Sequence, residues 1–133
     1  MRYILILDII IQYMNATAIT EEQNVKEFVT QWEKAINEKN IIALSQMYSA
    51  KVNLYEKMLI REEIIRLKSS YFNKTPYYNQ SSTLEYLHVY HYPNTPKSDS
   101  FFVTFNKIWT DRSTKNNSIG YLVVRREMGL GVL

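Results

Sequence analysis

The sequence predicts an α+β domain in which amphipathic helices come first and an antiparallel sheet follows. Apolar residues recur every three or four positions up to about residue 72, and from about Ser81 they alternate with polar ones. The length of 133 residues fits a single domain. A chain of this size can bury about two thirds of its unfolded surface, so its core needs no disulfide.

Composition excludes several classes of protein. The chain is 46% hydrophobic and 22% charged, which is typical of a globular domain. It contains no cysteine, and this excludes disulfides, thiolate metal sites and cysteine nucleophiles. Formal net charge is only +3, and Lys and Arg are scattered along the sequence, which argues against nucleic-acid binding. The sequence has no glycine-rich phosphate loop, nucleophile elbow or zinc-protease motif.

The first eighteen residues admit two interpretations. A cationic start, an apolar stretch and an Ala-x-Ala triplet at 16–18 are typical of a secretory signal peptide, which would make the protein extracytoplasmic or secreted. Asp8 interrupts that stretch, and the alternative is an ordinary N-terminal helix or strand of a cytoplasmic protein. The run is too short for a transmembrane helix. Under both interpretations we expect residues 1–18 to be peripheral and the domain to occupy residues 19–133.

Two helices are predicted in the first part of the domain. A capping box formed by Thr20 and Gln23 is expected to start a helix that runs to about residue 38. Its apolar residues follow the spacing of one buried face. Asn40 is expected to end this helix and to cap a second, short one over 41–48.

A short strand and a third helix are expected next. Alternation predicts the strand over 52–56, and helical spacing predicts the helix over 61–72. Glu62 and Glu63 lie in the first turn of that helix, where negative charge suits the helix dipole.

Three long strands are predicted in the second half of the chain, over 83–92, 101–110 and 118–127. In the first, alternation places Tyr90 on one face and His91 on the other. We expect the core to contain one set of large apolar residues: Phe28, Trp32, Ile36, Leu44, Leu54, Ile64, Phe105 and Leu122.

Over residues 20–127 the chain resembles the nuclear transport factor 2-like superfamily, also called the cystatin-like or cone-shaped α+β fold. The segments that carry the resemblance are Phe28-x-x-x-Trp32-x-x-Ala35-Ile36-Asn37-x-Lys39-Asn40, Leu44-x-x-Met47-Tyr48-Ser49-Ala50-x-Val52-x-Leu54-Tyr55 and Arg61-Glu62-Glu63-Ile64. The resemblance implies N-terminal helices packed on the concave face of a strongly bent antiparallel sheet. It is a pattern of hydrophobic spacing, so it concerns fold and not chemistry. Members usually close with a further strand, whereas residues 128–133 are few and glycine-interrupted, so we expect an exposed sheet edge.

The resemblance suggests one test for catalysis. The superfamily includes a ketosteroid isomerase that uses a carboxylate base and an oxyanion hole built from a tyrosine and a protonated acid. In this chain the base position falls on Glu56, the tyrosine position on Trp32 and the acid position on or near Gly120. Two of the three roles are therefore altered, and Glu56 alone supports the alternative of a small isomerase or lyase.

No metal or cofactor is expected. His88 and His91 are three apart on a predicted strand, so they face opposite sides and cannot hold one ion together.

The favoured hypothesis is a non-catalytic domain that binds a small apolar or mixed ligand, or a protein partner. The 11 tyrosines supply apolar rings with polar tips, which suit such a ligand. A homodimer through the outer face of strands 83–92 and 101–110 is a further expectation. The candidates to line the cone are Trp32, Tyr48, Tyr55, Tyr71, Tyr77, Tyr78, Tyr86, Tyr90 and Phe102.

Overall fold

The computed structural model describes residues 2–7, 19–82, 87–92 and 99–127. Over these residues the chain forms three helices and one mixed sheet that does not close, so the α+β prediction is confirmed. The helices are α1 (Ile19–Glu38), α2 (Ile41–Met47) and α3 (Arg61–Lys74). The strands are β1 (Arg2–Leu7), β2 (Tyr48–Leu54), β3 (Lys57–Ile60), β4 (Asn79–Ser82), β5 (His88–Tyr92), β6 (Ser100–Asp111) and β7 (Thr114–Glu127).

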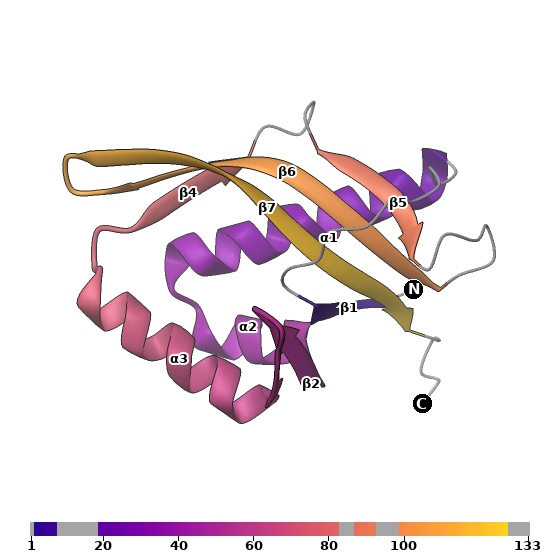
Figure 1. The fold of residues 1–133 in the computed structure, drawn as a ribbon, viewed down its shortest axis with the longest axis horizontal. Coiled ribbons are helices and arrows are strands. Elements are labelled where there is room, and N and C mark those ends of the chain that lie inside the picture. Colours follow the sequence, from indigo (N-terminus) through magenta and orange to yellow (C-terminus); the bar gives the residue numbers. More distant parts are fainter. Residues whose placement is uncertain (1, 8–18, 83–86, 93–98, 128–133) are drawn as a thin grey trace.

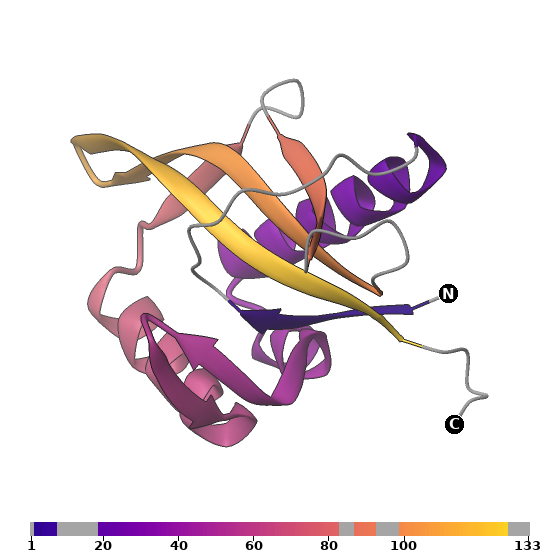
Figure 2. The same ribbon diagram turned by 45° about the vertical axis from the view of Figure 1, so that its right-hand side comes forward.

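The sheet has the strand order β3-β2-β1-β7-β6-β4, and β5 also pairs with β6. β5 and β4 follow one another along the same edge of β6, while β7 covers the other edge along its whole length. The pairing of β1 with β2 is parallel, and every other described pairing is antiparallel. The prediction of a purely antiparallel sheet is therefore wrong at this pair. Figures 1 and 2 show the long, twisted β6–β7 hairpin with α1 across one of its faces.

β1 lies inside the sheet, between β2 and β7 (Figure 2). Its side chains Tyr3, Ile4 and Leu5 are buried, and the Tyr3 hydroxyl donates a hydrogen bond to Glu21 on α1. The prediction that the N-terminal segment is peripheral is therefore wrong for residues 2–7. The same strand pairs with residues 123–127 of β7, so the edge that we expected to be exposed is covered. Residues 8–18 and the tail from residue 128 lie outside the described residues.

The helix ends follow local capping chemistry. α1 begins at Ile19, one residue before the predicted cap. The side chain of Asn40 accepts a hydrogen bond from the Ala43 amide at 3.0 Å, which confirms the predicted start of α2. At α3 the Glu63 carboxylate accepts from the Ile60 amide at 3.0 Å, and this satisfies one backbone donor at the helix start.

A hairpin stands where the sequence predicted one short strand. β2 begins at Tyr48, which was expected to end the second helix, and β3 was not predicted. Tyr55 and Glu56 form the turn, with φ of 50° and 67°. A two-residue turn with positive φ at both positions matches the twist of the flanking strands.

One core cluster joins all three helices to one face of the sheet, which we call the helix-covered face. Of the eight predicted core residues, seven are buried, and Leu54 is partly buried against the same cluster. The predicted alternation in β5 is confirmed, because Val89 and His91 are buried and Tyr90 is not. On the opposite face a small cluster centres on Phe102 and Val123. Both side chains are already buried within one chain, and pairing of two copies through this face stays a prediction.

Candidate functional site

A cavity of about 560 Å³ opens on the helix-covered face, among α1, α3, β4, β6 and β7. The arrangement of these elements can be followed in Figure 1. A cavity of this volume is typical of small-molecule sites. Its ring-bearing lining residues are Trp32, Tyr55, Tyr71, Phe72, Tyr78 and Trp109, and we call it the aromatic cavity.

Tyr78 is the centre of the ring cluster. Its ring stacks on Trp109 with centroids 5.7 Å apart and meets Tyr71 edge-on at 5.3 Å. The strand register explains the first contact, because Gln80 of β4 lies opposite Trp109 of β6 and Tyr78 directly precedes β4. Rings held in offset and edge-on pairs stay in place, so one wall of the cavity is preformed.

The polar groups on one wall of the cavity are joined by hydrogen bonds. The Tyr78 hydroxyl donates to Gln80 Oε1 at 2.8 Å, and Gln80 Nε2 donates to Glu33 of α1 at 3.5 Å. The side chain of Asn37 on α1 clamps the backbone of Gln80 with two hydrogen bonds. Asn37 Nδ2 donates to the Gln80 carbonyl at 2.7 Å, and Asn37 Oδ1 accepts from the Gln80 amide at 2.8 Å. The clamp fixes β4 on α1, so the position of the polar wall follows from the packing of these two elements.

Burial dominates the electrostatics at Tyr78. It raises the pKa of the Tyr78 phenol well above its usual range, Tyr71 adds to the shift, and the nearby Lys68 ammonium opposes it. The phenol therefore stays protonated in mildly alkaline solution and continues to donate to Gln80.

Gly120 makes room for an aromatic ring of the core. Gly120 of β7 pairs with Phe105 of β6, and the ring of Phe105 lies over it. A Cβ at position 120 would stand 2.4 Å from that ring, so only glycine leaves the space. Phe105 in turn meets Trp32 edge-on with centroids 6.3 Å apart. The position that the isomerase comparison assigns to an acid is thus occupied by an aromatic contact.

The structure brings together only some of the predicted ligand-binding residues. Trp32, Tyr55 and Tyr71 line the aromatic cavity, as does Tyr78. Tyr48 is fully buried beside it and accepts a hydrogen bond from Trp32 Nε1 at 3.1 Å.

The other candidates lie elsewhere. Tyr90 and Phe102 belong to the cluster on the opposite face of the sheet, so they do not share a site with Trp32. Tyr77 is 60% exposed and stacks under the guanidinium of Arg112. Tyr86 lies outside the described residues.

Glu56 is exposed in the turn between β2 and β3 and is not among the described lining residues of the aromatic cavity. A general base must come within hydrogen-bond reach of the proton that it removes. Its place in the fold therefore gives no support to a catalytic role in this cavity.

Sequence reasoning missed six polar or aromatic residues of the cavity: Lys68, Phe72, Gln80, Lys107, Trp109 and Ser118. Strand alternation carried a signal for two of them. Lys107 and Trp109 follow Phe105 at steps of two on β6, so all three face the same side. Gln80 had no such signal, because β4 was not predicted.

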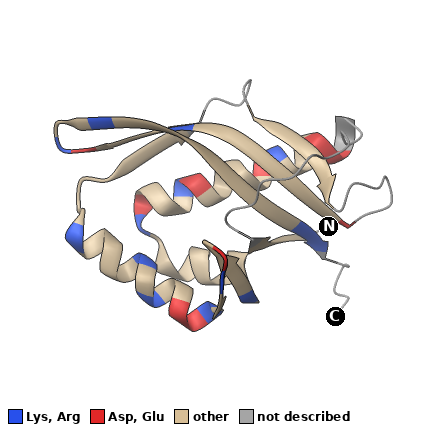
Figure 3. Ribbon diagram, viewed as in Figure 1, with Lys and Arg blue, Asp and Glu red and all other residues tan. Residues whose placement is uncertain are grey.

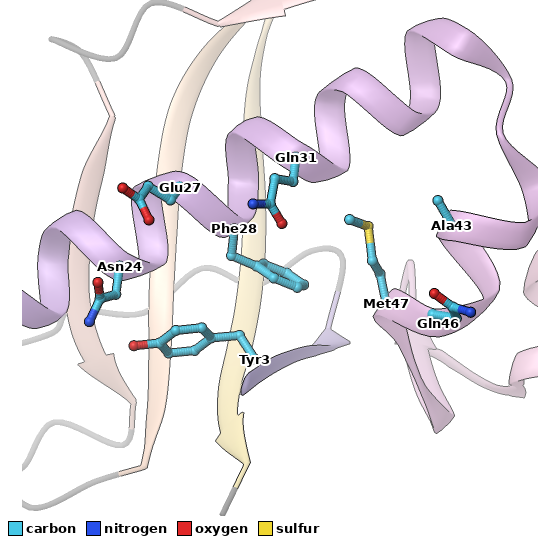
Figure 4. Close-up of a pocket in the computed structure, with 8 residues that line it drawn as sticks. All are labelled: Tyr3, Asn24, Glu27, Phe28, Gln31, Ala43, Gln46 and Met47. Carbon is cyan, nitrogen blue, oxygen red and sulfur yellow. The ribbon is translucent and has the colours of Figure 1, made fainter. Parts of the chain in front are cut away.

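A second cavity of about 800 Å³ lies between α1 and α2, with Tyr3 of β1 beside it (Figure 4). The rings of Tyr3 and Phe28 face it, while Glu27 and Gln31 of α1 are exposed to solvent. Burial raises the pKa of Tyr3 to about 12, and the hydrogen bond to Glu21 adds to the shift. The polar side chains Glu27 and Gln31 at this cavity are exposed, whereas Tyr78 and Gln80 of the aromatic cavity are buried and hydrogen-bonded, so the aromatic cavity is the better-organised site.

Other classes of site find little support. Within the described residues no three potential metal ligands come together. No helix in that part of the chain is long and apolar enough to cross a membrane. Basic residues lie on several elements and are interspersed with acidic ones (Figure 3).

Comparisons of the chain with protein-family models, with curated proteins and with solved structures found no match.

Proposed function

We propose that this protein is a non-catalytic domain that binds a small, largely apolar molecule in the aromatic cavity. One observation carries the proposal: both tryptophans of the sequence, Trp32 and Trp109, line this cavity together with Tyr71 and Tyr78. Rings supply a large apolar contact area, and the buried pair of Tyr78 and Gln80 supplies the few placed polar groups that such sites use. The resemblance to the nuclear transport factor 2-like superfamily supports the proposal at the level of fold only.

The position of the two tryptophans provides the assay. N-phenyl-naphthylamine is a neutral, apolar dye whose absorption overlaps tryptophan emission. We expect it to bind in the aromatic cavity, to become fluorescent and to quench Trp32 and Trp109 by energy transfer. Titration of the full chain with the dye gives a dissociation constant from both signals.

A matched pair of tyrosine variants locates the dye. Tyr71→Ala removes a ring that lines the cavity and is 42% exposed, while Tyr77→Ala removes a ring that is 60% exposed outside it. We expect Tyr71→Ala to weaken dye binding by about five- to thirty-fold, the equivalent of about 1–2 kcal/mol of lost ring contact. Tyr77→Ala should change it less than about two-fold. Equal effects of both variants, or no saturable binding, would refute the proposal.

A further inference from the structure

A groove adjoins the aromatic cavity along α3. It has a volume of about 390 Å³ and lies between α3 and the β2–β3 hairpin, which pack against each other (Figure 2). Leu54, Tyr55 and Leu67 line both this groove and the aromatic cavity. The two hollows therefore meet at these three side chains, and a ligand that fills one can continue into the other. We call the smaller hollow the hairpin groove.

One stripe of α3 lines both hollows. Glu63 and Leu67 line the hairpin groove, and Leu67 and Tyr71 line the aromatic cavity. Residues four apart on a helix lie on the same face, so these three side chains follow one line with Leu67 in the middle. At a rise of about 1.5 Å per residue the line is about 12 Å long, which gives the combined hollow an elongated form.

The β2–β3 hairpin supplies the opposite wall of the groove. Leu54 lies opposite Lys57 in the strand register, and Leu59 follows Lys57 at a step of two, so the three share one face. All three line the hairpin groove. Met58 lies between Lys57 and Leu59 on the strand, faces the other side and is not among the described lining residues.

The two hollows offer different kinds of apolar side chain. Six described lining residues of the aromatic cavity carry rings, whereas the groove combines one ring, Tyr55, with the leucines at positions 54, 59 and 67. Flat groups stack on rings, while leucines surround a flexible chain. At the junction Tyr55 is 70% exposed and Leu67 is 52% exposed. Neighbouring exposed apolar side chains that border a hollow are typical of ligand-binding grooves.

We propose that the ligand of the aromatic cavity is an elongated molecule, a flat ring system that carries an unbranched alkyl chain, and that the hairpin groove binds the chain. This inference rests on the proposed function and adds the shape of the ligand to it. The rings around Tyr78 hold the head, and the chain passes Tyr55 and Leu67 to reach Leu59. Each methylene that enters the groove leaves water, so affinity increases with chain length.

Two isomeric competitors test the elongated shape. Para-n-octylphenol and para-tert-octylphenol share one formula and one head, but the side chain is linear in the first and compact in the second. Each is titrated against the bound dye at neutral pH, where a phenol is uncharged, and below the concentration at which it forms micelles. We expect the linear isomer to displace the dye about ten-fold better. From butyl through hexyl to octyl, the affinity of the linear phenols should rise about two- to four-fold per methylene.

A matched pair of lysine substitutions locates the chain. Leu67→Lys places an ammonium at the junction, and an alkyl chain that passes it would have to desolvate that charge. We expect the preference for the linear isomer to fall from about ten-fold to less than about two-fold. The ratio of the two isomers cancels any change in the binding of their common head. Met58→Lys adds the same charge at a side chain that is 61% exposed outside both described linings, and it should keep the preference.

The outcomes separate the two proposals. Equal affinity of the two isomers for the unmodified chain would refute the chain subsite and leave the aromatic cavity as a binding site. An unchanged preference in Leu67→Lys, or an equal loss in Met58→Lys, would refute the placement of the chain in the hairpin groove. If Leu67→Lys fails to fold, the isomer pair and the chain-length series on the unmodified chain still decide the question. Failure of the dye and of every competitor to bind would overturn the proposed function itself.

Discussion

Truncating Leu5 in β1 should cost the fold about 3 kcal/mol of unfolding free energy. Leu5 is fully buried in the main core cluster and lies opposite Val124 on β7. Replacement of a buried leucine by alanine removes its transfer free energy and leaves a cavity, and such changes cost about 2–5 kcal/mol. Ile42→Ala is the matched control, because Ile42 is 73% exposed on α2 and should lose less than about 0.5 kcal/mol.

Equilibrium denaturation in urea, followed by the fluorescence of Trp32 and Trp109, measures both variants on the same scale. Equal m-values would show that the unfolded states are comparable. A loss below about 1 kcal/mol for Leu5→Ala would refute the placement of β1 in the core.

Removal of residues 1–18, which leaves a chain that begins at Ile19, is a more severe test of the role of β1. Without β1 the edges of β2 and β7 lose their partner, and the buried sites of Tyr3, Ile4 and Leu5 are vacated. We expect this chain to lack a cooperative transition and to regain one when a synthetic peptide of residues 1–8 is added. A cooperative transition with unchanged free energy would instead restore the peripheral N-terminus and strengthen the export hypothesis, since cleavage after residue 18 would yield this same chain.

Three further outcomes are expected. Gly120→Ala should lower the unfolding free energy by about 1–3 kcal/mol, because its Cβ would meet the ring of Phe105 at 2.4 Å, whereas the exposed neighbour Ile119 should tolerate alanine. The pKa of Tyr3 is about 12 in the folded chain, against the ordinary tyrosine value of 10.0. The unfolding free energy should therefore fall as the pH rises from 10.0 to about 12, and below this window Tyr3 contributes no pH dependence. The unfolded chain loses the proton first, so Tyr3→Phe should reduce that alkaline slope, and an unaltered slope would count against the buried phenol. Glu56→Gln should leave dye affinity and stability unchanged within about 0.5 kcal/mol, and turnover of an unsaturated ketone that this variant abolishes would instead support the enzyme alternative.

Periodicity predicted the helices and the long strands because their side chains face one continuous core. Phe28, Trp32 and Ile36 repeat at helical spacing, and all three are buried where α1 meets the sheet. Asn40 was predicted as a cap from its side-chain chemistry alone, which is local and does not depend on tertiary structure.

The features that the sequence did not predict have physical causes. The β2–β3 turn consists of Tyr55 and Glu56, and both adopt positive φ although neither is a glycine or asparagine, the residues that usually indicate such a turn. The role of β1 depends on pairing with residues more than a hundred positions later, and no local pattern contains that information. The aromatic cavity was predicted only in part, since its rings come from α1, α3, β6 and two connecting segments, and the sequence does not state how these lie relative to one another.

The place of β1 also sets an order of events during synthesis. Residues 3–5 leave the ribosome early, while their antiparallel partners at 124–126 are made roughly 120 residues later. At translation rates of about 5–20 residues per second, the apolar β1 strand waits about 6–24 s for that partner. The helices can form in this interval, but the sheet cannot close around β1. The parallel partner β2 is made only about 45 residues after β1, so one edge of β1 can pair early, while the edge that β7 covers stays open until β7 emerges. An open apolar edge invites pairing with another chain, and packing of β1 against α1 and β2 opposes that during synthesis.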